Sequence, residues 1–100
     1  MLSKVVQTRV GDATALGIRW QGGQCIIIAA NKGLVACGIL DMKIAEQWGF
    51  AVAIARGTTE KPLVTDEDLL KAPIVEATEK ARQLGVRIGM RGHEALEKLT

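Results

Sequence analysis

The sequence predicts one α/β domain of mixed (α+β) type: an antiparallel β-meander, then a β-α-β crossover and C-terminal helices, all on a mixed sheet. Three observations predict this fold. The chain has 100 residues, enough for one core and too few for two ordinary domains. Its first half reads as strands, and its second half mixes helical and strand patterns. No repeat, low-complexity segment or linker divides it, so residues 1–100 are expected to form a single domain.

The first half of the chain contains four predicted strands. Residues 5–10 form a short strand, and residues 13–20 alternate with a period of two, which is typical of an antiparallel strand with one face more solvated. Residues 25–30 and 34–40 are apolar on both faces and flank Asn31-Lys32-Gly33, residue types that favour a turn. Strands of this kind are normally covered on both faces, so these two are predicted to form the centre of the sheet.

The chain changes character at Asp41, a suitable N-cap for a helix over residues 42–48 that Gly49 would end. Residues 50–55 are apolar throughout, which predicts another buried strand. A strand-helix-strand segment of this length is typical of a crossover between parallel strands. A loop over residues 56–62 follows.

Helices are predicted for most of the remaining chain. A capping-box pattern opens a helix over residues 65–71, and a proline opens another over residues 73–84. Residues 86–89 read as a last short strand. The terminal helix covers residues 92–99, with three residues facing the core: Ala95, Leu96 and Leu99.

Composition limits the functions that the chain can have. Basic and acidic residues are near balance, 13 against 11, and aromatic residues make up 3% of the chain. Without a basic run or a stacking platform, no nucleic-acid partner is expected. No apolar run approaches the ~18 residues of a membrane span and the N-terminus does not read as a signal peptide, so we expect a cytoplasmic protein without a membrane partner. A chain this small that is 48% apolar leaves apolar surface exposed, which favours a homo-oligomer.

Two cysteines, Cys25 and Cys37, lie on neighbouring predicted strands. With a two-residue loop between these strands, Cys37 faces Ile26 and Cys25 points to the other face of the sheet. With a three-residue loop, the two thiols are diagonal neighbours about 7 Å apart, too far for a disulfide. Both arrangements predict reduced thiols, as expected in the cytosol.

Four segments together resemble one known family. They are Asn31-Lys32-Gly33, Cys37-Gly38-Ile39-Leu40-Asp41, Asp68-Leu69-Leu70, and Gly89-Met90 followed by Gly92 and Glu94-Ala95-Leu96. In this order they resemble the YunC-like family of small bacterial and archaeal proteins, over residues 13–99. That family is a domain of unknown function, so the resemblance implies a fold and no activity, cofactor or site residue.

Cys37 and Asp41 are the candidate catalytic residues. Strand parity puts them on one side of a strand, with Asp41 at the carboxyl end, where ligands usually bind in open α/β sheets. Cys37 would be the nucleophile, with Asp41 or His93 as its base. The alternative is that Cys37 is a packed core residue, about 13 Å from Asp41 by strand geometry, and that Asp41 is only an N-cap.

The candidate ligand-binding residues are Arg56, Thr58, Arg91 and His93. Arg91 and His93 place positive charge at the start of the last helix, against its dipole, which a bound small anion would explain. Arg56 and Thr58 follow a buried strand and suit a carboxylate or phosphate. The alternatives are that Glu94 or a neighbouring subunit balances the charge, and that the loop is an ordinary one.

No metal site, cofactor motif or serine triad is predicted. One histidine and two thiols do not have a metal-ligand spacing, no phosphate-binding glycine motif is present, and the only serine is Ser3. Our preferred hypothesis is a small anionic-ligand-binding or regulatory domain acting as a homo-oligomer. The alternatives are a small thiol-dependent enzyme using Cys37 and a purely structural or assembly protein.

Overall fold

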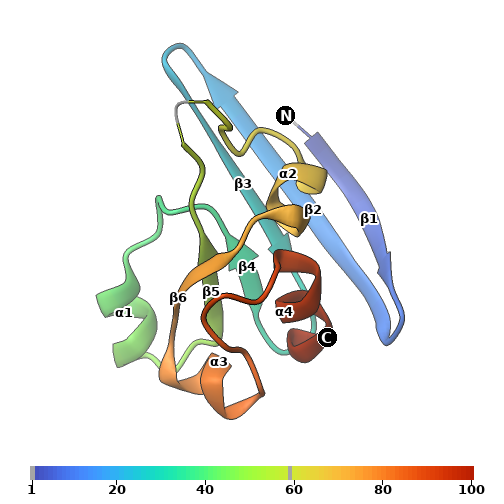
Figure 1. Cartoon of the computed structure of the whole chain (residues 1–100), viewed down its shortest axis with the longest axis vertical. Helices are drawn as coiled ribbons and strands as arrows, with labels where there is room; N and C mark the ends of the chain where they lie inside the picture. The colour runs from blue at the N-terminus through green and yellow to red at the C-terminus, as the bar shows by residue number, and fades with distance from the viewer. Residues whose placement is uncertain (1, 59) are drawn as a thin grey trace.

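The computed structural model describes residues 2–58 and 60–100, with the side chain of Leu2 left out, and builds them around one mixed sheet (Figure 1). Six strands lie in the sheet in chain order: β1 (Leu2–Thr8), β2 (Gly11–Trp20), β3 (Gly23–Ala29), β4 (Leu34–Ala36), β5 (Val52–Ala55) and β6 (Ile74–Ala77). The helices of the described residues are α1 (Met42–Gln47), α2 (Asp66–Lys71), α3 (Glu79–Gln83) and α4 (Gly92–Leu99).

The predicted meander and crossover are both confirmed. Strands β1 to β4 pair antiparallel, β4 and β5 pair parallel across α1, and β6 returns antiparallel to β5. The predicted cap of α1 also forms, because the Asp41 side chain accepts a hydrogen bond from the Lys43 N–H at 3.0 Å. Gly49 follows the helix with φ of +71°, a backbone conformation that favours glycine.

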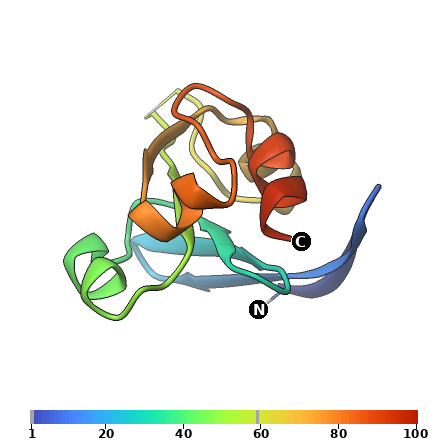
Figure 2. The same ribbon diagram turned by 90° about the horizontal axis from the view of Figure 1, so that it is seen from below.

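The main core lies on one face of the sheet, which we call the inner face. There α2, α3 and α4 pack on alternate strand residues. Helix α1 lies apart from these three helices, at one end of the sheet (Figure 2). The buried residues of β2 to β5 on the inner face are Ala13, Ala15, Ile26, Ile28, Val35, Ala53 and Ala55, and Ile74 and Ala77 of β6 belong to the same core. The predicted inward residues of α4 are confirmed, since Ala95, Leu96 and Leu99 have no exposed surface.

The opposite, outer face of the sheet is covered only in part. Helix α1 packs through Ala45 against residues of β4 and β5, making a second, smaller core. The outer face of β2, further along, carries the large side chains of Leu16, Ile18 and Trp20, which are 39%, 50% and 50% exposed. The predicted alternation of β2 is therefore present, but its solvated side is the one with the large apolar residues. With Val5 of β1, these residues form what we call the outer apolar face.

The helix predicted over residues 73–84 is wrong in its first half, which is strand β6. A register shift between Ile54 and Ala55 of β5 marks an irregular pairing with β6. It lets Ile74 and Ala77, three residues apart, both be buried. A three-residue spacing of buried residues is also what a helix produces, which explains the error. A helix begins only after Thr78, whose side chain caps α3.

Three predicted strand boundaries also need correction. Residues 86–89 are a loop, whose Gly89 N–H donates to Ile74 O at 2.8 Å. An isolated antiparallel bridge follows between Pro73 and Arg91, where Ile74 N–H donates to Met90 O at 2.8 Å. Strand β4 ends at Ala36, because the apolar Leu40 packs with α1 in the smaller core instead of continuing the sheet. Strand β5 begins at Val52, and Phe50 is half exposed. No helix in the described ranges has the length and apolarity of a membrane span.

Candidate functional site

Three of the four predicted ligand-binding residues, Arg56, Thr58 and Arg91, line one cavity of about 530 Å³. The structure adds two further basic side chains to its wall, Lys61 and Lys71. We call this site the basic cavity. The rest of its lining is Gly57, Leu63, Asp68, Ala72 and Pro73.

One wall of the basic cavity is the loop that follows β5. The N–H of Thr58 donates to the Lys61 carbonyl at 3.1 Å, and the Lys61 N–H donates to the Thr58 hydroxyl oxygen at 3.0 Å. Gly57 lies so close to the returning chain that a Cβ there would be 2.8 Å from the Leu63 nitrogen. These contacts fold the loop back on itself and hold Lys61 over the cavity.

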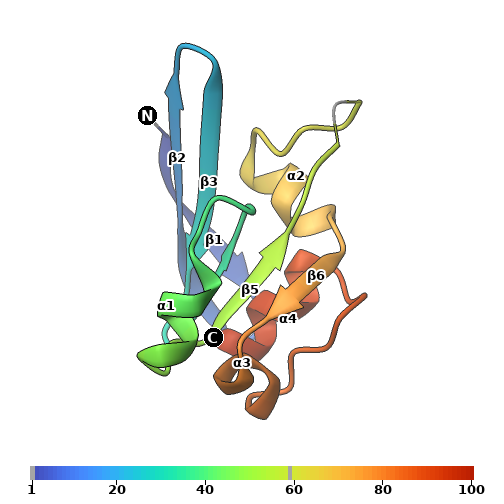
Figure 3. The ribbon, with the colours of Figure 1, turned by 90° about the vertical axis from the view of Figure 1, so that its left-hand side faces the viewer.

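The other wall joins the end of α2 to the start of α4, two helices that lie one above the other in Figure 3. The Arg91 guanidinium donates to the Lys71 carbonyl at 3.2 Å, at the carboxyl end of α2, where the helix dipole favours a cation. The N–H groups at the start of α4 already have partners: Gly92 N–H donates to Ala72 O and Arg91 N–H to Glu94 Oε1, both at 2.9 Å. The guanidinium of Arg91 is thus held at the end of α2, while Glu94 bonds to the backbone N–H of Arg91.

Positive charge predominates in the basic cavity. Arg56 pairs with Glu76 at 2.8 Å, but both side chains are about half exposed, so water weakens this pair. Among residues 2–58 and 60–100, no ion pair involves Lys61, Lys71 or Arg91. Four cations thus face a single lining carboxylate, that of Asp68.

Asp68 is committed to the local backbone. Its carboxylate accepts hydrogen bonds from the N–H groups of Thr65 at 3.0 Å and Val64 at 3.2 Å. These two bonds lower the pKa of Asp68, so it is ionised at neutral pH. The Thr65 hydroxyl accepts from the Asp68 N–H in return, which confirms the predicted capping box of α2.

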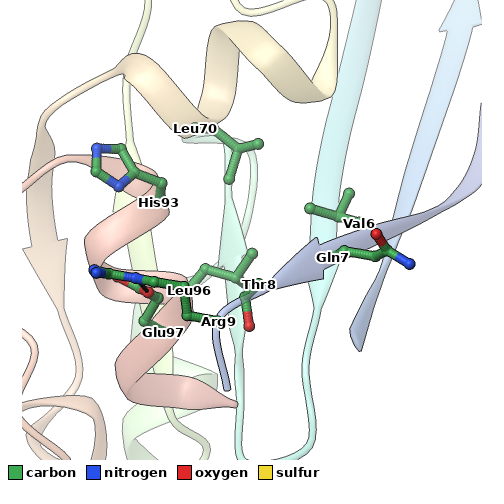
Figure 4. Close-up of a pocket in the computed structure, with 8 residues that line it drawn as sticks. All are labelled: Val6, Gln7, Thr8, Arg9, Leu70, His93, Leu96 and Glu97. Atoms are coloured by element: carbon green, nitrogen blue, oxygen red, sulfur yellow. Dashed lines mark hydrogen bonds and ion pairs between the residues drawn. The ribbon is translucent and has the colours of Figure 1, made fainter. Parts of the chain in front are cut away.

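His93, the fourth predicted ligand residue, lies elsewhere. It lines a separate cavity of about 340 Å³ between α4 and the end of β1 (Figure 4). In that cavity Arg9 pairs with Glu97 at 2.9 Å, and this hydrogen bond lowers the pKa of Glu97. The structure therefore separates His93 from Arg91, although they are two residues apart in the chain.

The candidate catalytic residues do not come together either. Cys37 lines a cavity of about 480 Å³ that shares Gly57, Thr58 and Leu63 with the basic cavity. Neither Asp41, which caps α1, nor His93 is part of its lining. The thiol of Cys37 donates to the sulfur of Cys25, which lies 3.7 Å away. No three His, Cys, Asp or Glu side chains of the described chain are grouped so that they could hold a metal ion.

The expected separation of the two thiols is wrong. Strands β3 and β4 have the register of a two-residue loop, with Ala29 opposite Leu34, as in the first of the two predicted arrangements. Side-chain alternation then puts the thiols on opposite faces. Alternation applies only inside a strand, however, and β4 ends one residue before Cys37, so the two sulfurs can meet.

Lys61 and Lys71 were missed by the sequence reasoning. Lys61 belongs to the predicted loop of Arg56, and Lys71 closes the predicted helix of Asp68, so both elements were known. Nothing in the local pattern indicates that this loop, the end of α2 and the residue before α4 meet. Only long-range contacts bring them together.

Comparisons with known proteins find a family but no activity. The sequence model of one protein family, a domain of unknown function (DUF1805), matches residues 36–99. The uncharacterized protein YunC of Bacillus subtilis (strain 168) is 30% identical over 86 residues, which cover 86% of this chain and 84% of that protein. The crystal structure of a protein of unknown function, TA1206 from Thermoplasma acidophilum, matches with a TM-score of 0.86 at 21% identity, over 99% of this chain and 92% of that one. The structural match shows the fold alone.

Proposed function

Because the chain belongs to the DUF1805 family, as its YunC-like segments predict, and this family's description names no activity, we propose a function from the geometry. The protein binds a small anion in the basic cavity and acts in the cytoplasm as a homo-oligomeric binding or regulatory domain.

The convergence of four basic side chains carries this proposal. Arg56 and Lys61 come from the loop after β5, Lys71 from the end of α2, and Arg91 from the residue before α4. Like charges gathered around one cavity repel one another, and an anion bound among them removes that repulsion. Two guanidinium groups also favour the planar, paired acceptors of a carboxylate or phosphate.

The remaining lining suggests the form of the ligand. Leu63, Ala72 and Pro73 add an apolar wall beside the cations. A volume of about 530 Å³ lies within the range of small-molecule sites. We therefore expect an organic carboxylate or phosphate ester with an apolar body, held by its charged end.

Thermal unfolding with inorganic phosphate, pyrophosphate and citrate tests this function. At a concentration one hundred times Kd, an anion that binds only the folded state adds about 2.7 kcal/mol to the free energy of unfolding. In a chain of this size that raises Tm by about 10 °C or more. The Arg91→Ala variant should bind the anion at least about tenfold more weakly, since a charge-assisted hydrogen bond is lost.

Lys43→Ala is the matched control, because Lys43 is an exposed cation on α1, which packs on the outer face of the sheet. Its affinity for the same anion should stay within about twofold of the original. The function is refuted when none of the anions raises Tm, or when the Arg91→Ala variant binds the stabilising anion as tightly as the original protein does.

The outer apolar face supports the homo-oligomer. At their observed exposures, its four side chains offer on the order of 400 Å², half of the roughly 800 Å² per partner of a standard stable interface. Ile44, Trp48 and Phe50, in and next to α1, are further exposed apolar residues. The facing positions on β1 and β3, namely Ser3, Cys25 and Ile27, carry no charge. A second copy of this chain can thus lie on it without like-charge repulsion.

A further inference from the structure

Two thiols from different segments meet at the end of β4. Cys25 belongs to β3, and Cys37 is the first residue after β4, still bound to β3 by a hydrogen bond from its N–H to the Ile26 carbonyl at 3.1 Å. Their sulfur atoms are 3.7 Å apart, which is van der Waals contact, and both side chains are half-buried and free.

We propose that Cys25 and Cys37 are a modification site, at which oxidation joins them in a reversible intramolecular disulfide. A disulfide needs its sulfurs about 2.05 Å apart, so they must approach each other by less than about 2 Å. The chain beyond Cys37 leaves room for this shift, because Gly38 and Ile39 are exposed and belong to no helix or strand.

An oxidant can reach the pair from the side of Cys37. Its side chain lines a cavity of about 480 Å³ that is bordered by Gln24, Ile39 and Pro62. Cys25 does not line this cavity, and its position on β3 is opposite Ile18, on the outer face of the sheet. Cys37 is therefore the cysteine that reacts first, and Cys25 is the one that resolves the product. The pair does not depend on an anion in the basic cavity.

The oxidant is a small disulfide. The Cys37 thiolate attacks one of its sulfurs, its S–S bond breaks, and one small thiolate leaves with the bonding electrons. The Cys25 thiolate then attacks the Cys37 sulfur of this mixed disulfide and releases the second small thiolate. Overall the two protein thiols lose two electrons and two protons, and one small disulfide becomes two small thiols.

Deprotonation of Cys25 limits the second step. Burial, followed by the hydrogen bond and charge of Cys37, raises the pKa of Cys25 to about 11. The contributions from Cys37 disappear once its sulfur is in the mixed disulfide, whereas the burial remains. We therefore expect the closing step to become faster as the pH rises above neutrality.

Incubation of the folded protein with oxidised glutathione, followed by intact-mass and peptide analysis, tests the proposal. The expected product is a monomeric chain that is lighter by about 2 Da, has no free thiol after denaturation, links Cys25 to Cys37, and returns to the starting mass with dithiothreitol. A disulfide between these residues, which are twelve positions apart in the chain, should also raise Tm by roughly 5–10 °C.

Two variants assign the roles. Cys25→Ser should stop at one glutathione adduct on Cys37, and Cys37→Ser should react at least about tenfold more slowly. The proposal is overturned when the original chain keeps two free thiols, stops at a stable glutathione adduct, or links two molecules through these cysteines. The mass of the original chain decides this even when a variant fails to fold.

Discussion

At the scale of single residues, Thr78 connects three elements through one buried hydroxyl group. Its oxygen accepts hydrogen bonds from the Val52 N–H at 3.0 Å and the Ala81 N–H at 3.3 Å, and it donates to the Phe50 carbonyl at 2.7 Å. Thr78 has no exposed surface, so water cannot replace these bonds. This residue fixes the point where β6 ends and α3 begins.

Thr78→Val keeps the shape of the side chain and removes all three hydrogen bonds. We expect the free energy of unfolding to fall by about 2–4 kcal/mol, because two buried N–H groups and a partly buried carbonyl lose their partner. Thr78→Ser keeps the hydroxyl and should lose only about 1 kcal/mol, for one buried methyl group. Urea unfolding measures both. Equal losses in the two variants would contradict the role given to the hydroxyl.

At the same scale, the structure gives a reason for Gly38, the glycine of the segment Cys37-Gly38-Ile39-Leu40-Asp41. A Cβ at this position would lie 2.9 Å from the Nε atom of Arg56 and 3.2 Å from its Cγ atom. The absence of a side chain thus leaves space for Arg56 to lie over the turn after β4. The segment that carries Cys37 therefore also positions a residue of the basic cavity.

At the scale of elements, the capping box of α2 makes stability depend on pH. The pKa of Asp68 is lowered in the folded protein because its carboxylate accepts hydrogen bonds from Thr65 and Val64. A lowered pKa means that the ionised form stabilises the fold. This contribution is present above the ordinary pKa of 3.8 and is lost as the pH falls through the folded value.

Asp68→Ala should therefore lower the free energy of unfolding by about 0.5–1 kcal/mol at pH 7, the usual size of an exposed cap contact. The difference between this variant and the original protein should shrink as the pH falls below 3.8. Denaturant unfolding over a pH series measures it. Glu60→Ala, which removes an exposed carboxylate in the loop before α2, is the control and should show neither effect. A difference that stays constant down to acid pH would show that the carboxylate charge plays no part.

At the scale of the whole molecule, the outer apolar face decides between a monomer and an assembly. Ile18→Asp places a charge at its centre and should convert a dimer, or a larger assembly, into a monomer. Ile88→Asp is the matched control, because Ile88 is 53% exposed, like Ile18 at 50%, but lies in the loop before α4. Light scattering coupled to size exclusion measures the mass. A monomeric original protein, or an assembly that Ile18→Asp leaves intact, would contradict this interface.

The candidate site was predictable in its parts and not in its assembly. Arg56, Thr58 and Arg91 were identified from residue type and from their positions at the ends of elements, and the structure places them around one cavity. The same reasoning predicted His93, which lines another cavity. Residues two positions apart at the start of a helix point in different directions, so His93 and Arg91 do not share a site. Which residues at the end of a helix face one cavity depends on the elements that pack against that helix.

The sequence by itself determined what depends on residues within about four positions of one another: the caps of α1 and α2, the turn before β4, the alternation of β2 and the inward face of α4. Such signals are hydrogen bonds and periodicities within a single segment. Only the tertiary structure decided that residues 74–77 are a strand, that four cations share a cavity, and that the sulfurs of Cys25 and Cys37 touch. Each of these joins segments distant in the chain, and the energy that selects it comes from packing and pairing between them.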